Sequence, residues 1–139
     1  MLQPHVVDQL VGRLIQRIVE GSGVTGPEYA LTSWLNAVGS ATPSDLADGL
    51  GMSATTLSAI IDRLVRKGEV RRVPNRDDGR SYLLEPTAQG KATNARNGAR
   101  FMVEIDALRA NLAGDPEEIL ASMRLLEDAL RKTIADQKP

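Results

Sequence analysis

The sequence has no cysteine and only one histidine, His5, among its 139 residues. Without cysteine the chain has no disulfide, no zinc finger and no thiol-based redox sensor. One histidine argues against a histidine-based metal site and against a catalytic triad. The spacing of the acidic residues does not indicate a carboxylate metal site either. We therefore expect no metal, no cofactor and no enzymatic activity.

The sequence also lacks a long hydrophobic run. A membrane-spanning helix needs about 18 or more consecutive apolar residues, and no segment reaches that length. The N-terminus, MLQPHVVDQL, has neither a basic leader nor an unbroken apolar core, so no secretory signal is expected. These absences predict a cytoplasmic protein with no membrane partner.

The charge is nearly balanced, with a formal net charge of −1, but it is unevenly distributed. Residues 61–100 carry ten basic and five acidic side chains, whereas the segments on either side are both net acidic. A local cluster of basic residues is the electrostatic footprint expected of a nucleic-acid-binding surface, even in a chain that is neutral overall.

The stretch 43–87 predicts two short helices joined by a tight turn, over residues 44–50 and 54–67. Gly51 stands where the first helix must stop with a residue that tolerates positive φ, and Ser53 is a good N-cap for the second. We also expect the small side chains at Ala47 and Gly51 to let the two helices meet closely. In the second helix, one apolar face would pack on the first helix, formed by Leu57, Ile60, Ile61 and Leu64. An ordinary helical hairpin would explain these two helices equally well.

An arginine-rich hairpin follows, with strands predicted over residues 69–73 and 81–85. Together with the two helices it predicts a winged helix-turn-helix, a device that places a helix in a DNA groove. The alternative is a solvated, charged hairpin without a binding role.

Four further helices are predicted, over residues 3–20, 27–38, 88–113 and 117–135. Trp34, the only tryptophan, is expected to anchor the core rather than to bind a ligand. The first and last helices carry strong apolar stripes that one chain of this size has little core to cover. We therefore expect an intertwined homodimer built from the terminal helices, with a compact monomeric bundle as the alternative.

The hairpin and the helix after it resemble the MarR family of bacterial transcription regulators. The segment DGRSYLLEPTAQG contains that family's wing pattern, with Asp78, Arg80, Thr87 and Gly90 in register. Upstream, LVRKGEV is similar to the family's junction between recognition helix and wing. Pro86 departs from the pattern, since the family usually has leucine there.

The resemblance implies a mainly α fold with a small β-hairpin wing, six helices and a single domain over residues 1–139. Residues 27–87 would form the DNA-binding lobe, and residues 1–22 and 100–139 would dimerise. The implied partners are a second copy of the chain and double-stranded DNA carrying a palindromic operator, and the implied role is a repressor. The dimer interface would include Val7, Leu10, Leu14, Ile119, Met123, Leu126 and Leu130.

The expected DNA-binding residues follow from the same register. On the recognition helix, hydroxyl and methyl groups would face base edges in the major groove, and Arg63 would reach a phosphate or a guanine edge. On the wing, Arg80 would enter the minor groove, and Asp78 would hold an arginine and shape the tip. The full set is Ser44, Ser53, Thr55, Thr56, Ser58, Ala59, Arg63, Arg71, Arg72, Asn75, Arg76 and Arg80.

Many members of the family release DNA when a small phenolic or anionic molecule enters a crevice beside the DNA-binding lobe. Tyr29 and Trp34 are the residues expected near such a crevice, although simple packing would explain each of them as well. The exposed face of the recognition helix is small and neutral. A winged-helix protein-interaction module that does not bind DNA is therefore the alternative function.

Overall fold

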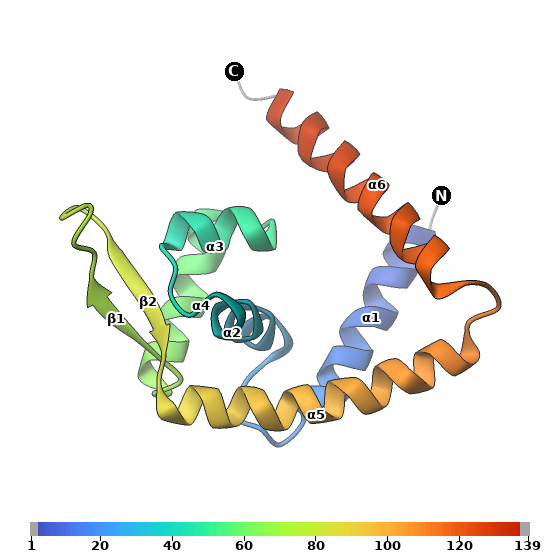
Figure 1. Cartoon of the computed structure of the whole chain (residues 1–139), viewed down its shortest axis with the longest axis horizontal. Coiled ribbons are helices and arrows are strands. Elements are labelled where there is room, and N and C mark those ends of the chain that lie inside the picture. Colours follow the sequence, from blue (N-terminus) through green and yellow to red (C-terminus); the bar gives the residue numbers. More distant parts are fainter. Residues whose placement is uncertain (1–2, 137–139) are drawn as a thin grey trace. The chain divides into compact units, whose positions relative to one another are not determined.

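The computed structural model describes residues 3–136 and divides them into two compact units, with the boundary after Glu104. The described residues form six helices and one two-stranded antiparallel sheet, as predicted. The first unit contains α1 (Gln3–Val19), α2 (Gly26–Val38), α3 (Pro43–Leu50), α4 (Ala54–Arg66), β1 (Val70–Pro74), β2 (Tyr82–Pro86) and the first part of α5 (Ala88–Asn111) (Figure 1). The second contains the end of α5 and α6 (Pro116–Asp136).

Local capping signals determine where α2, α3 and α4 begin. Thr25 and Thr42 each form a capping box with an acidic residue three positions later, and a proline follows each threonine in the first turn. The Ser53 hydroxyl accepts the backbone N–H of Thr56 at the start of α4, as predicted. Because these caps satisfy backbone groups that a helix leaves unpaired, three consecutive helices begin at sharply defined positions.

Two glycines near the turn between α3 and α4, Gly49 and Gly51, have different structural roles. Gly51 ends α3 in the left-handed conformation, with φ of 63°, as its position predicted. The expectation that Gly51 permits a close helix contact is wrong, because a Cβ there would meet nothing within 4 Å. A close contact of α3 lies instead at Gly49 and is made with α2, because a Cβ at Gly49 would lie 2.9 Å from Cζ2 of Trp34. The indole therefore packs directly on the backbone of α3.

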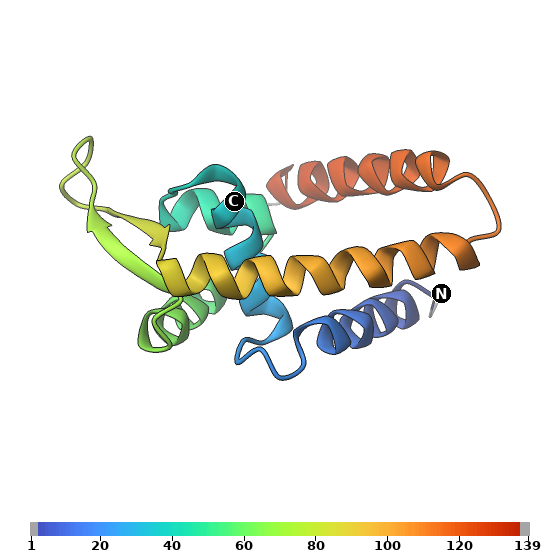
Figure 2. The same cartoon turned by 60° about the horizontal axis from the view of Figure 1, so that its bottom comes forward.

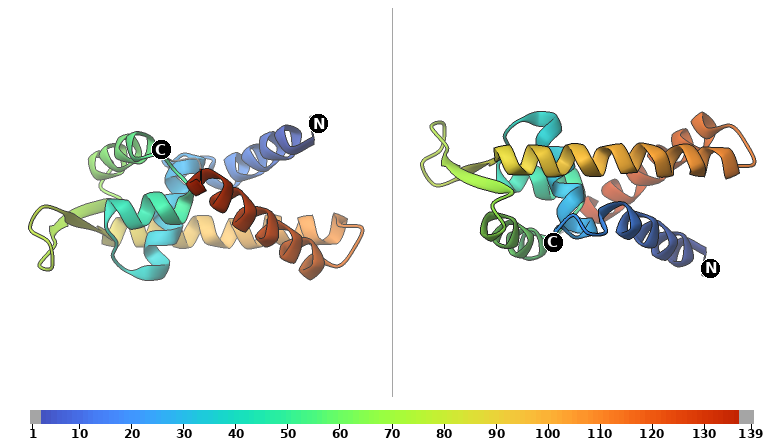
Figure 3. Two further views of the ribbon diagram at one scale, coloured as in Figure 1. Left: turned by 90° about the horizontal axis from the view of Figure 1, so that it is seen from above. Right: turned by 90° about the horizontal axis from the view of Figure 1, so that it is seen from below.

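The hairpin strands begin and end one residue later than predicted. Glu69 lies outside β1 because its amide donates to Leu64 O at the end of α4, while its carbonyl accepts from Thr87 N. The ladder then runs from Val70 opposite Pro86 to Pro74 opposite Tyr82. Both views in Figure 3 show the turn of the hairpin projecting beyond α3 and α4.

The core of the first unit lies where α2, α3, α4 and the base of the hairpin meet. Leu31, Leu35, Leu46, Leu64 and Leu84 are completely buried there. The four predicted apolar positions of α4 are all buried. The opposite face of α4, which carries the expected DNA-reading residues, is exposed. Because one face of α4 is buried in the core, the opposite face is left exposed, and the candidate site lies on that exposed face.

The start of α5 is joined tightly to the end of α4. The Thr87 hydroxyl donates to Gly68 O at 2.6 Å and accepts the backbone N–H of Gly90 at 3.0 Å. Gly90 lies so close to Glu69 that a Cβ there would be 1.9 Å from the Glu69 carbonyl oxygen. This contact explains why glycine is needed three residues after the threonine. Figure 2 shows α5 continuing from this junction as one uninterrupted helix.

In the second unit, α6 starts from an Asp115 cap and has no buried residue. Its side chains Met123, Leu126 and Leu130 are each more than half exposed. On α1, in the first unit, Val7 and Leu10 are also more than half exposed. The first two and last three residues of the expected dimerisation segments lie outside the described residues.

Candidate nucleic-acid interface

The expected base-reading residues lie together on one exposed face at the N-terminal half of α4. The Ser53 hydroxyl donates to the Thr56 hydroxyl at 2.9 Å, which leaves the Thr56 hydroxyl hydrogen available to a ligand. Ser44 is exposed at the start of α3. The exposed side chains on this face are Ser53, Thr55, Thr56, Ser58 and Ala59.

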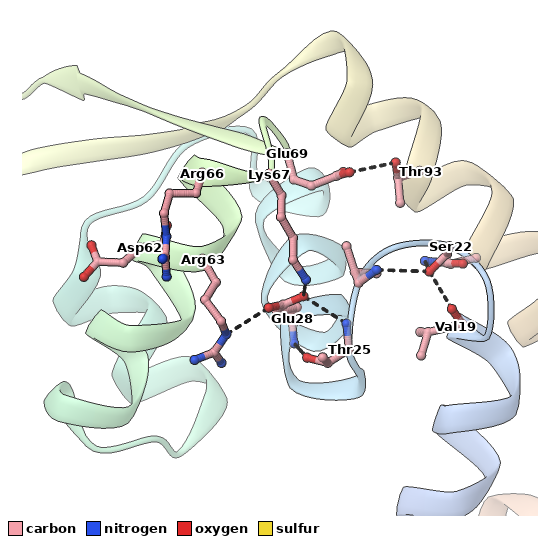
Figure 4. A network of polar contacts seen from close by, with 12 residues as sticks. Val19, Ser22, Thr25, Glu28, Asp62, Arg63, Arg66, Lys67, Glu69 and Thr93 are labelled. Carbon is pink, nitrogen blue, oxygen red and sulfur yellow. Dashed lines mark hydrogen bonds and ion pairs between the residues drawn. The ribbon is translucent and has the colours of Figure 1, made fainter.

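The buried carboxylate of Glu28 on α2 forms ion pairs with two cationic side chains at the C-terminal end of α4. Glu28 Oε1 accepts from Arg63 Nε at 3.0 Å, and Glu28 Oε2 accepts from Lys67 Nζ at 2.6 Å (Figure 4). The same Oε2 accepts the Thr25 backbone N–H that closes the capping box. One side chain therefore caps α2 and neutralises two cations at the end of α4.

Two opposing effects act on the pKa of Glu28. Burial alone raises it, but hydrogen bonds from Lys67, the Thr25 amide and Arg63 lower it by more, so the pKa lies below its usual value. Glu28 is consequently ionised at neutral pH although it is buried. Arg63 uses its Nε for this contact, so the expected contact of its guanidinium with DNA remains a prediction.

A second ion pair joins α4 to the wing. Arg72 on β1 donates to Asp62 of α4 at 2.5 Å, and its guanidinium carbon lies 5.3 Å from the centroid of the Tyr82 ring. Arg71 pairs with Glu85 across the hairpin at 2.8 Å. Two of the expected wing arginines are therefore engaged within the fold, and Arg72 fixes the wing to the recognition helix.

At the wing tip, short side chains shape the turn. Asp78 Oδ1 accepts the backbone N–H of Arg80 at 3.0 Å, and Asn75 Oδ1 accepts that of Asp77 at 3.1 Å. Asp78, which was expected to hold an arginine and shape the tip, contacts Arg80 through the backbone N–H of that arginine. Arg76 and Arg80 are exposed on either side of this turn.

Sequence reasoning missed the roles of Glu28, Lys67 and Asp62. The motif Thr25-x-x-Glu28 before an apolar run is a capping-box signal that would have marked Glu28 as ordered. It would not have indicated the partners of Glu28, which lie 35 and 39 residues away.

Beside the winged helix-turn-helix there is a cavity of about 730 Å³, bounded by α1, α2, the α3–α4 turn and Phe101 of α5. Both residues expected near a ligand crevice, Tyr29 and Trp34, line it. Burial raises the pKa of Tyr29, against a smaller opposing effect of Ser33, so the phenol is neutral at physiological pH. Trp34 also packs against the core, as predicted.

Residues 3–136 contain no group of three or more His, Cys, Asp or Glu side chains arranged to hold a metal ion. Nor is any helix in this part of the chain long and apolar enough to cross a membrane.

Known proteins resemble this chain in sequence. The MarR family model matches residues 22–81. The multiple antibiotic resistance protein MarR of Escherichia coli is 31% identical over 88 residues, which are 63% of this chain and 61% of that protein. The MarR protein of Salmonella typhimurium is 28% identical over the same lengths. The match thus spans less than two thirds of these curated relatives.

Solved structures resemble it over most of the chain. A crystal structure of a MarR mutant from E. coli in complex with operator DNA has a TM-score of 0.80 and 26% identity, covering 92% of this chain and 91% of that one. The M. tuberculosis transcriptional regulator MOSR in complex with DNA has a TM-score of 0.82 over 94% and 95% of the two chains. At 21% identity, the second likeness concerns the fold alone.

Proposed function

We propose that this chain is a MarR-family protein and a sequence-specific DNA-binding transcriptional regulator, acting as a repressor, on the strength of its similarity to MarR proteins in sequence and structure. The observation that carries the proposal is the exposed face of α4 beside an arginine-bearing wing, the two being joined by the Asp62–Arg72 ion pair. A helix and a wing held at a fixed separation suit adjacent grooves of one DNA duplex. A regulator of this kind acts on the chromosome, so the proposal includes a cytoplasmic location.

Affinity and sequence preference would come from different parts of this surface. Arg76 and Arg80 are exposed at the wing tip and would contact phosphates or a narrow minor groove. The neutral face of α4 would read bases through the Thr55 and Thr56 hydroxyl and methyl groups. Its lack of charge means that the recognition helix contributes selectivity more than electrostatic attraction.

The proposal includes a homodimer that reads a palindromic operator. The exposed apolar side chains of α1 and α6 support it, since surfaces of this kind on a soluble domain mark an interaction site. Two recognition helices related by a two-fold axis would meet half-sites about one DNA turn apart. We assign residues 1–22 and 100–139 to this interface and residues 27–87 to the DNA-binding lobe. A small-molecule effector in the cavity beside Trp34 would relieve repression.

The test is a fluorescence anisotropy titration of the wild-type protein with the DNA upstream of its own gene and with unrelated DNA, at two salt concentrations. Arg80→Ala should weaken binding to both and lower the salt slope by about 0.9 for each phosphate that the variant no longer neutralises. Arg124→Ala removes an exposed arginine of α6, outside the proposed DNA-binding lobe, and is the matched control. With self-association shown by sedimentation equilibrium to equal that of the wild type, it should leave both quantities unchanged.

Base readout by α4 is tested separately with Thr56→Val, which removes a hydroxyl and keeps the side-chain shape. Its affinity should fall more on operator DNA than on unrelated DNA, by up to about tenfold. Equal losses on all DNA would contradict base readout. If the wild-type protein binds no DNA at either salt concentration, the alternative of a protein-interaction module would be preferred.

A further inference from the structure

The cavity beside Trp34 gathers most of the aromatic side chains of a chain that has few. The sequence contains one tryptophan, two tyrosines and one phenylalanine. Trp34, Tyr29 and Phe101 all line the cavity, although α2 and α5 are far apart in sequence. Its volume of about 730 Å³ suits a small organic molecule. Aromatic faces are a defining component of sites that bind organic cations.

The charge of the lining has one sign. Among the residues that the structure describes, Asp8 is the only one with a formal charge that lines the cavity, and no lysine, arginine or histidine does so. Asp8 shares one face of α1 with Val11, Gly12 and Ile15, which also line the cavity. Elsewhere on α1, Arg17 is paired with Glu104 at 3.1 Å and does not line the cavity. A bound anion would therefore lose its hydration without gaining a cationic partner, whereas a cation would gain both a carboxylate and aromatic faces.

We propose that this cavity binds a hydrophobic organic cation, such as an aromatic amine or a quaternary ammonium compound. The charge is opposite to that of the anionic effectors implied by the family resemblance. The claim that such a cation acts as an effector rests on the proposed function, whereas the claim that the cavity binds the cation does not. Trp34 supplies a physical link to the DNA-binding lobe, because its ring packs on the α3 backbone at Gly49.

The experiment compares two probes of similar size and opposite charge, benzyltrimethylammonium and phenylacetate, by isothermal titration calorimetry. The cation should bind at least about tenfold more tightly than the anion. Because Trp34 is the only tryptophan, its emission reports whether the probe enters this cavity. We expect the cation to change Trp34 emission with the same dissociation constant that calorimetry gives.

Asp8→Asn identifies the group that selects the charge. Asp8 is exposed on α1, so the variant should fold, and its preference for the cation should fall to within about twofold. Asp77→Asn, which removes an exposed carboxylate at the hairpin turn, far in sequence from the cavity lining, causes the same change in net charge and should keep the preference.

Three results would overturn the proposal. The first is an anion that binds as tightly as the cation, and the second is an Asp8→Asn variant with unchanged preference. The third is the absence of probe binding with constant Trp34 emission, as expected if a second copy of the chain fills the cavity. The DNA titration separates this inference from the proposed function. A protein that binds DNA but shows no cation preference refutes the inference alone, whereas the reverse result refutes the proposed function alone.

Discussion

The proposed DNA-binding lobe and the last helix have the same kind of sequence pattern with opposite structural outcomes. In α4, apolar residues at helical spacing are completely covered, with Leu57 at 1% exposure. In α6, residues at the same spacing remain open, with Leu126 at 60% exposure. Apolar periodicity thus identifies a face that must be buried, but it does not identify the partner that buries it. Within the lobe that partner is the same chain, and for α6 we propose a second copy.

The largest expected loss of stability is at Gly90, where the lobe joins α5. Gly90→Ala would force a Cβ against the Glu69 carbonyl oxygen, which is backbone and cannot rotate away. We expect the free energy of unfolding to fall by about 4 kcal/mol, measured by chemical denaturation monitored by circular dichroism. A loss below about 1 kcal/mol would mean that this junction is much looser than the structure indicates.

A matched pair of leucine substitutions tests the comparison directly. Leu46→Ala leaves a cavity in the lobe and should cost about 3 kcal/mol whatever the protein concentration. Leu126→Ala should weaken self-association instead, so its effect on the melting temperature should grow as the protein is diluted. Denaturation at two protein concentrations, with sedimentation equilibrium, distinguishes the two. Concentration-independent destabilisation by Leu126→Ala would show that α6 is covered by its own chain.

Substitution of the buried Glu28 should change the free energy of unfolding by less than the substitutions above, and the change should depend on pH. Glu28→Gln should lower the free energy of unfolding by about 2 kcal/mol at pH 7, because Arg63 and Lys67 lose their counter-charge. Glu104→Gln removes another arginine-paired carboxylate, which is less buried, and should cost under about 1 kcal/mol.

The sign of the pH effect follows from the lowered pKa of Glu28 in the folded state. The folded protein binds fewer protons there than the unfolded chain, so the stabilisation is complete above the usual carboxyl pKa of 4.5. It is lost as the pH falls below that value through the lower folded pKa. Glu28→Gln should remove this part of the acid destabilisation. An unchanged pH profile in the variant would contradict the assignment.

The smallest expected change in stability is a stabilisation, and it concerns Gly98 in α5. A Cβ at Gly98 would meet nothing within 4 Å, and its backbone is helical. Gly98→Ala should therefore raise the free energy of unfolding by roughly 0.5–1 kcal/mol, seen as a higher melting temperature. Gly98 thus serves as the control for Gly90, because the two glycines of one helix differ in what surrounds them. Destabilisation at Gly98 would point to a neighbour from another molecule.

The sequence by itself determined the elements and their order. The six helices, the Gly51 turn and the Ser53 cap follow from signals that act over a few residues, such as capping groups, glycine conformation and apolar spacing. The strand boundaries were shifted by one residue because Glu69 is used in the contact with Thr87. No local signal reports such a contact.

Only the tertiary structure decided what the side chains of those elements do together. It paired Glu28 with Arg63 and Lys67, joined Asp62 to Arg72, and brought Phe101 to the cavity that holds Trp34. Each of these contacts joins residues of different elements, and the sequence pattern within one element carries no information about its partner in another. The physical reason is that interactions between residues close in the chain determine a helix or strand. A site depends instead on how the packing of the core brings the faces of different elements together.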